Sequence, residues 1–109
     1  MTRGEIWTGP DDPGYAGRPR PVVIVQHPSF ALLDSVTICG FTRDPAQIPL
    51  IRIAVEPSAL NGLEFPSRIM VDKILTVRKS KLGRRIGRLA DADMKRLGHA
   101  IVNFLALAD

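Results

Sequence analysis

Arginine and hydroxyl side chains stand at the ends of two predicted strands, and their chemistry suits the binding of a phosphate group. Arg18 and Arg20 flank Pro19, where a proline-rich loop enters a run of β-branched residues. Because a strand edge is rigid, guanidinium groups held there can bind a phosphate bidentately and stabilise a pentacoordinate phosphorane without a metal. The first hypothesis is therefore phosphoryl chemistry based on arginine.

A second polar group, Thr42-Arg43-Asp44, follows the next predicted strand. It offers a hydroxyl, a guanidinium and a carboxylate in consecutive positions, and the two strand ends meet if the strands pair. The simpler interpretation is that Arg20 is an ordinary strand-edge charge and that Thr42 and Asp44 form a turn. Both interpretations stand at this point.

Positive charge is concentrated in residues 78–88, which contain no acidic side chain. A polyanion such as an RNA backbone would be attracted to this basic segment, whereas the plainer interpretation is a solvated loop. The whole chain has 15 Lys and Arg against 11 Asp and Glu, and a net charge of +4 by itself indicates little. The basic residues of the segment are Arg78, Lys79, Lys81, Arg84, Arg85 and Arg88.

The sequence lacks several well-known catalytic motifs. The sequence has no glycine-rich phosphate loop, no His-Glu-x-x-His and no Gly-x-Ser-x-Gly. Cys39 with His27 or His99 is formally a nucleophile and its base, but a thiol in mid-strand is more simply inert packing. We expect His27 to have a turn role and His99 to lie at or near the surface. With one cysteine and two histidines, the sequence predicts no disulfide, no metal and no cofactor.

The chain has 109 residues, of which 45% are hydrophobic and 24% charged, and this size fits one domain over residues 1–109. No stretch approaches the roughly 20 apolar residues that cross a bilayer. The first residues lack the apolar core of a secretory signal. We therefore expect a soluble, cytoplasmic protein without a membrane partner.

Short strands dominate the first two thirds of the predicted structure. Residues 21–26 suit a strand buried on both faces, and residues 35–41 alternate between two faces. Further strands are expected over residues 4–8 and 51–55, and one or two more within 69–77. Nine prolines and nine glycines separate these runs, which favours a small sandwich or barrel.

The end of the chain predicts an amphipathic helix that starts at Asp91. Asp91 or Asp93 is placed to cap it and to oppose the helix dipole, and Gly98 suggests close packing, a dimer contact or simple tolerance. Residues 9–20, with three prolines and three glycines, are the longest stretch without a strand or helix signal. A long loop in a small domain is often functional. The apolar stripe of the helix is Met94, Leu97, Ile101, Phe104 and Leu105, and Ala108 extends it.

Four blocks of the sequence, in order and followed by the helix, resemble the MazF/PemK toxins of bacterial toxin–antitoxin systems. They are residues 3–7 (RGEIW), 17–26 (GRPRPVVIVQ), 38–42 (ICGFT) and 67–77 (SRIMVDKILTV), the last running into 82–83 (LG). The resemblance covers nearly the whole chain. It implies a mainly β fold, a small SH3-like β-barrel with a C-terminal α-helix, assembled as a homodimer.

The resemblance also implies a metal-independent endoribonuclease that cuts single-stranded RNA at short sequences. In that mechanism the ribose 2′-hydroxyl attacks the adjacent phosphorus and leaves a 2′,3′-cyclic phosphate and a 5′-hydroxyl. A cognate antitoxin is implied as a partner, with its C-terminal tail in the RNA groove.

Carried over by position, the family's essential arginine falls on Arg20 and its threonine or serine on Thr42. Arg20 would stabilise the developing negative charge, and Thr42 would hydrogen-bond a phosphate oxygen. Asp72 matches an acidic residue of the family, in a catalytic or a structural role, although Lys73 stands where the family has glutamine.

The loop before Arg20 departs from the family, because residues 13–17 (PGYAG) offer no glutamate or histidine as a general base. Asp11, Asp12 or Asp44 would have to substitute, and an aspartate with an ordinary pKa is a poor base for a 2′-hydroxyl. This departure keeps a second function open, an RNA- or antitoxin-binding module with weak catalysis. A gyrase-targeting toxin is a third, since gyrase poisons share the fold.

For RNA binding, we expect arginines and lysines to contact phosphates and a loop aromatic to stack on a base. Trp7 is a second aromatic candidate. The residues expected to bind RNA are Tyr15, Arg18, Arg43, Arg78, Lys79 and Lys81.

Overall fold

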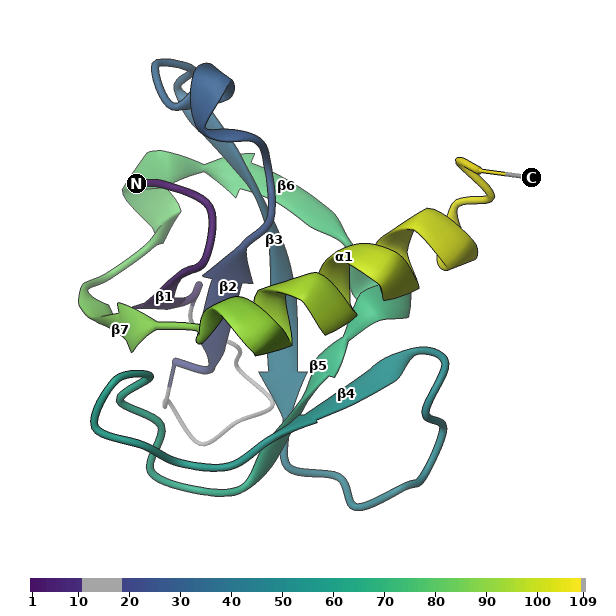
Figure 1. Cartoon of the computed structure of the whole chain (residues 1–109). Helices are drawn as coiled ribbons and strands as arrows, with labels where there is room; N and C mark the ends of the chain where they lie inside the picture. The colour runs from purple at the N-terminus through teal and green to yellow at the C-terminus, as the bar shows by residue number, and fades with distance from the viewer. Residues whose placement is uncertain (11–18, 109) are drawn as a thin grey trace.

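The computed structural model describes residues 1–10 and 19–108, in which a curved antiparallel sheet is crossed by a helix (Figure 1). The predicted mainly β fold with a C-terminal helix is confirmed. Within this described part, no helix has both the length and the apolar character of a membrane span. The elements are β1 (Glu5–Thr8), β2 (Pro21–Ile24), β3 (Ser35–Thr42), β4 (Arg52–Val55), β5 (Ser67–Met70), β6 (Leu75–Arg78), β7 (Arg85–Arg88) and α1 (Asp91–Phe104).

The sheet has the strand order β4-β5-β3-β2-β1-β7, and β6 also pairs with β3. β2 pairs along one edge of β3, whereas the other edge pairs first with β6 and then with β5. A short 3-10 helix, η3 (Val71–Lys73), lies between β5 and β6. The long strand β3 therefore joins the β4–β5 pair to the rest of the sheet.

β2 is buried on both faces, as its sequence predicts, and β3 also has buried side chains on both faces. Val23, Cys39 and Phe41 face the core beneath α1, and each is at most 2% exposed. Ile24 and Ile38 belong to a second apolar cluster together with Leu82. Consecutive side chains of a strand point to opposite faces of the sheet. Val23 and Ile24 are consecutive in β2 and belong to different clusters, so the two clusters lie on opposite faces.

Helix α1 packs on the first of these clusters through Leu97 and Ala100, which are both buried. The expected capping by Asp91 or Asp93 is wrong, because the N-cap residue is Ala90 and no side chain caps the helix. Both aspartates lie in the first turn, where their charge opposes the helix dipole as expected. The carboxylate of Asp93 instead pairs with Arg96 at 2.6 Å.

The basic segment is more ordered than a solvated loop. Its first part ends β6 and forms the 3-10 helix η4 (Lys79–Lys81), and its last part is strand β7, paired with β1. Sequence pattern did not indicate β7, because Ile86 is the one large apolar residue in Arg85–Arg88. Backbone pairing with β1, rather than a hydrophobic period, defines this strand.

The contact of Leu97 with the sheet predicts a large effect on stability. Leu97 is completely buried, so Leu97→Ala should lower the free energy of unfolding by about 2–5 kcal/mol. Urea denaturation followed by circular dichroism measures this. The matched control is Leu32→Ala, at a side chain 97% exposed, which should change stability by less than about 0.5 kcal/mol. Equal effects of the two substitutions would contradict the packing described.

Candidate active site

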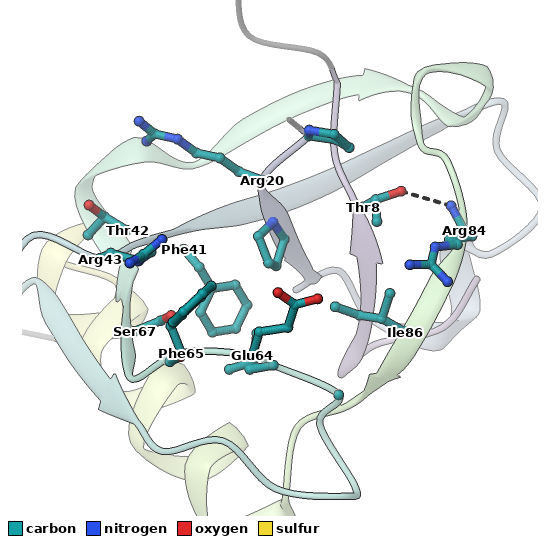
Figure 2. Close-up of a pocket in the computed structure, with 14 residues that line it drawn as sticks. Thr8, Arg20, Phe41, Thr42, Arg43, Glu64, Phe65, Ser67, Arg84 and Ile86 are labelled. Carbon is teal, nitrogen blue, oxygen red and sulfur yellow. Dashed lines mark hydrogen bonds between the residues drawn. The ribbon is translucent and has the colours of Figure 1, made fainter. Parts of the chain in front are cut away.

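A cavity of about 390 Å³ opens where β2 begins and β3 ends. Arg20, Thr42 and Arg43 lie on one side of it, and Thr8 and Arg84 lie on the other (Figure 2). The segment that connects β4 with β5 supplies Glu64 to the lining. The cavity therefore collects charged and hydroxyl groups from five separate parts of the chain.

Arg20 and Thr42 are brought together by the pairing of β2 with β3. The register pairs Val22 with Gly40, and two further residues along each strand are Arg20 and Thr42. Directly opposed residues on antiparallel strands have Cβ atoms about 5 Å apart. The expectation that the two strand ends meet is confirmed, and both side chains line the same cavity.

Turn hydrogen bonds hold the chain that leaves β3. The backbone N–H of Asp44 donates to Thr42 Oγ1 at 3.1 Å, and that of Ala46 donates to Asp44 Oδ1 at 3.0 Å. The turn interpretation is thus correct for both side chains. A hydroxyl that accepts one hydrogen bond still carries its proton, so Thr42 can donate to a phosphate oxygen. Asp44 is absent from the cavity lining found among the described residues.

An arginine stacked on an aromatic ring forms one wall of the cavity. The Arg43 guanidinium carbon lies 3.8 Å from the ring centroid of Phe65, which is 41% exposed. Stacking restricts the guanidinium while leaving its N–H donors open to an anion. Phe65 was not a candidate in the sequence, because no local pattern places it beside Arg43.

On the other side of the cavity, Thr8 and Arg84 join β1 to the basic segment. Arg84 N donates to Thr8 Oγ1 at 2.9 Å, and Thr8 N donates to the Arg84 carbonyl at 2.8 Å (Figure 2). A Cβ on Gly83 would lie 2.3 Å from Thr8 Oγ1, so this approach needs glycine. Arg84 is the basic residue of this segment that lines the cavity among the described residues.

Three of the basic residues expected to bind RNA, Arg78, Lys79 and Lys81, lie away from the cavity. Arg78 pairs with Ser35, at the opposite end of β3 from Thr42. Lys79 donates through its ammonium group to the carbonyl of Ala31, and neither it nor Lys81 is among the lining residues. Tyr15 and Arg18 fall outside the residues that the structure describes, together with Asp11 and Asp12.

Asp72 belongs to an ion-pair cluster outside the cavity lining. It accepts a hydrogen bond from the guanidinium of Arg52, and its other oxygen lies 3.3 Å from Lys73 Nζ. Burial acts to raise its pKa, but the hydrogen bonds from Arg52 and Lys73 outweigh burial and hold the pKa below its ordinary value. This environment favours the structural role over the catalytic one.

The remaining nucleophile and base candidates have structural roles. Cys39 is completely buried, and burial raises the pKa of its thiol to about 12, as expected for inert packing. His27 accepts a hydrogen bond from Ser29 N at 3.1 Å and so forms the predicted turn. His99 is exposed on α1, and Trp7 donates its indole N–H to Glu5 at 3.0 Å. In the described ranges, no three His, Cys, Asp or Glu side chains cluster as metal ligands would.

Comparisons with known proteins agree with this geometry. The family model for the PemK-like, MazF-like toxin of type II toxin–antitoxin systems matches residues 2–105. A curated relative from Mycolicibacterium smegmatis, named a probable endoribonuclease MazF, is 44% identical over 108 residues, which is 99% of either chain.

Solved structures are similar over the same extent. The Mycobacterium tuberculosis toxin MazF-mt6 has a TM-score of 0.78 at 28% identity, covering 98% of this chain and 100% of that one. A mycobacterial endoribonuclease in complex with its cognate antitoxin has a TM-score of 0.82 at 25% identity, covering 100% of this chain and 98% of that one.

The environment of Cys39 predicts an unreactive thiol. Because burial raises its pKa to about 12, almost no thiolate forms at pH 8, and Ellman's reagent should not react with the folded protein. In denaturing urea one thiol per chain should react. Reaction of the folded protein at the rate of a free thiol would contradict the burial.

The lowered pKa of Asp72 predicts a pH-dependent contribution to stability. A carboxylate with a folded-state pKa below its unfolded value stabilises the protein above the unfolded pKa, about 3.9, and loses this effect as pH falls through the folded pKa. Asp72→Asn should therefore be less stable than wild type at neutral pH, and the difference should shrink in acid. Urea denaturation at several pH values measures it, with exposed Asp34→Asn as control. A difference independent of pH would contradict the ion pair.

Proposed function

The chain belongs to the family of PemK-like, MazF-like toxins of type II toxin–antitoxin systems, and from this membership we propose that it is an endoribonuclease that cuts single-stranded RNA. The observation that carries the proposal is the convergence of Arg20 and Thr42 at the paired ends of β2 and β3, inside one cavity. The name of the 44% identical relative, probable endoribonuclease, supports the same activity.

The proposed chemistry uses the RNA's own 2′-hydroxyl as the nucleophile. The 2′-oxygen attacks the adjacent phosphorus, the bond from phosphorus to the 5′-oxygen breaks, and the products are a 2′,3′-cyclic phosphate and a 5′-hydroxyl. The attacking oxygen loses a proton and the leaving oxygen gains one, so the step balances without a metal or a second substrate. The attacking 2′-oxygen has to lie in line with the leaving 5′-oxygen, and this alignment depends on how firmly the phosphate is held.

Arg20 and Thr42 would hold that phosphate. A guanidinium stabilises the additional negative charge of the pentacoordinate phosphorus and can give a proton to the leaving oxygen. Thr42 would donate its hydroxyl proton to a non-bridging oxygen while its oxygen accepts from Asp44 N. Arg43 and Arg84, at either side of the cavity, would contact the neighbouring phosphates.

A cognate antitoxin is the proposed protein partner. One solved structural neighbour is an endoribonuclease in complex with its cognate antitoxin. An acidic C-terminal tail would suit a cavity lined by Arg20, Arg43 and Arg84, and by filling it would exclude RNA.

The homodimer implied by the resemblance is a proposal that the surface of α1 supports. At the end of α1 and just beyond it, Phe104 is 46%, Leu105 48% and Leu107 67% exposed, although Phe104 and Leu105 belong to the predicted apolar stripe. Clustered exposed apolar side chains are typical of protein interfaces.

Substitution of Arg20 tests the catalytic assignment. Wild-type protein should cut a long RNA in the presence of EDTA and leave 5′-hydroxyl ends, which polynucleotide kinase labels without prior phosphatase treatment. Arg20→Ala should cut about 10²–10³-fold more slowly at saturating RNA, because a group that stabilises the transition-state charge is lost. Lys95→Ala, on the exposed face of α1, removes the same charge and should cut normally.

Three outcomes would count against the proposal. RNA left intact at high protein concentration would contradict the ribonuclease activity and favour a binding module. Dependence on a divalent ion would contradict the metal-free chemistry. Full cleavage by Arg20→Ala would contradict the role of that residue.

A further inference from the structure

Glu64 places a carboxylate in a cavity whose other described charged side chains are arginines. The residue is exposed, and its carboxylate points into the cavity (Figure 2). Phosphate groups would be attracted to Arg20, Arg43 and Arg84 but repelled by Glu64. An ionised carboxylate only accepts hydrogen bonds, so its ligand has to supply N–H or O–H donors.

The walls near Glu64 are apolar and suit a flat ring. Phe41 and Leu63 are 2% and 7% exposed, and Ile86 and the half-exposed Phe65 complete this part of the lining. The cavity, at about 390 Å³, lies in the size range of small-molecule sites. Apolar walls with one acceptor group are what an unstacked nucleobase needs for stacking and for reading its polar edge.

The segment that carries Glu64 is held firmly by Asn61, which is 4% exposed. Asn61 Oδ1 accepts from the backbone N–H groups of Ser58 at 2.9 Å and Leu63 at 3.0 Å, and Asn61 Nδ2 donates to the Glu56 carbonyl at 2.8 Å. Every polar atom of the Asn61 side chain is thereby engaged within the segment. Such a network fixes the backbone up to Leu63, the residue just before Glu64.

Two glycines, which have no side chain, allow the same segment to lie close against β7. Gly62 has a φ of +68°, and a Cβ there would lie 2.0 Å from the carbonyl oxygen of Ile86. A Cβ on Gly87 would lie 2.5 Å from the backbone of Asn61. Arg88 N also donates to the Leu60 carbonyl at 3.0 Å. These contacts hold the segment that carries Glu64 against β7 and so fix the position of Glu64.

We propose that this cavity is a nucleobase subsite next to the scissile phosphate, in which Glu64 selects a base that carries an exocyclic amino group. The inference rests on the proposed ribonuclease function. Cytosine, adenine and guanine offer an amino donor on the Watson–Crick edge, whereas uracil places carbonyl oxygens on both sides of its N3–H. Those carbonyls would face the carboxylate and be repelled. Uracil is therefore the base that the subsite should reject.

Glu64→Gln tests the inference, because the amide keeps the shape of the side chain but adds N–H donors that can pair with uracil carbonyls. Cleavage of a randomised single-stranded RNA library by wild type should show one position beside the cut with uracil depleted. Matched oligonucleotides with cytosine or uracil at that position should then differ about tenfold or more in kcat/KM. Glu64→Gln should remove most of this difference.

The control is Glu56→Gln at the start of the same segment. Glu56 is exposed and is not a lining residue, so its substitution removes the same charge and should leave the base preference as in wild type. Replacing guanosine by inosine, which lacks the exocyclic amino group, gives an independent measurement if guanine is the selected base. The loss should appear with wild type and not with Glu64→Gln.

The outcomes separate this inference from the proposed function. Wild-type protein that cuts no RNA contradicts the proposed function, and the inference falls with it. Cleavage by wild type with an unchanged base preference in Glu64→Gln contradicts the inference alone. An equal loss of cleavage for all sequences, with a changed acidic limb of the pH–rate profile, would instead make Glu64 the proton acceptor and would also overturn the inference.

Discussion

The antiparallel pairing of β2 with β3 is the constraint on which both the core and the cavity depend. Its register sets Val23 opposite Cys39 in the core beneath α1 and Ile24 opposite Ile38 in the other apolar cluster. The same register, continued two residues, brings Arg20 to Thr42. A slip by one residue would turn every side chain of β2 to the other face, so burial on both faces fixes the geometry of the cavity as well.

Patterns of apolar residues predicted those elements whose stability comes from burial. The β-branched run of β2, the alternation in β3 and the stripe of α1 were each apparent, because each reports a face packed on the core. β7 was missed because backbone pairing and two glycine contacts hold it. The helix N-terminus was also misjudged, since Asp93 pairs with Arg96 instead of capping the backbone.

The residues of the candidate site also divide into those that the sequence predicted and those that it did not. Arg20 and Thr42 were found because each stands at the end of a strand that the sequence shows clearly, and because a family pattern passes through them. Glu64 and Phe65 were not found, since the segment between β4 and β5 carries no periodic signal. Its place at the cavity depends on the close approach of Gly62 to Ile86 and of Gly87 to Asn61, contacts between residues far apart in the sequence that no local pattern expresses.

The chemistry of Cys39 has a practical consequence. It is the sole cysteine of the chain, it is completely buried, and its thiol stays protonated at neutral pH. A cysteine introduced at any exposed position would thus carry the one reactive thiol of the native protein. Leu32, in the connection between β2 and β3, is 97% exposed. A fluorophore or spin label attached at this position would leave both apolar clusters intact. Docking of nucleic acid or of a partner chain could then be followed by spectroscopy without first removing the native thiol.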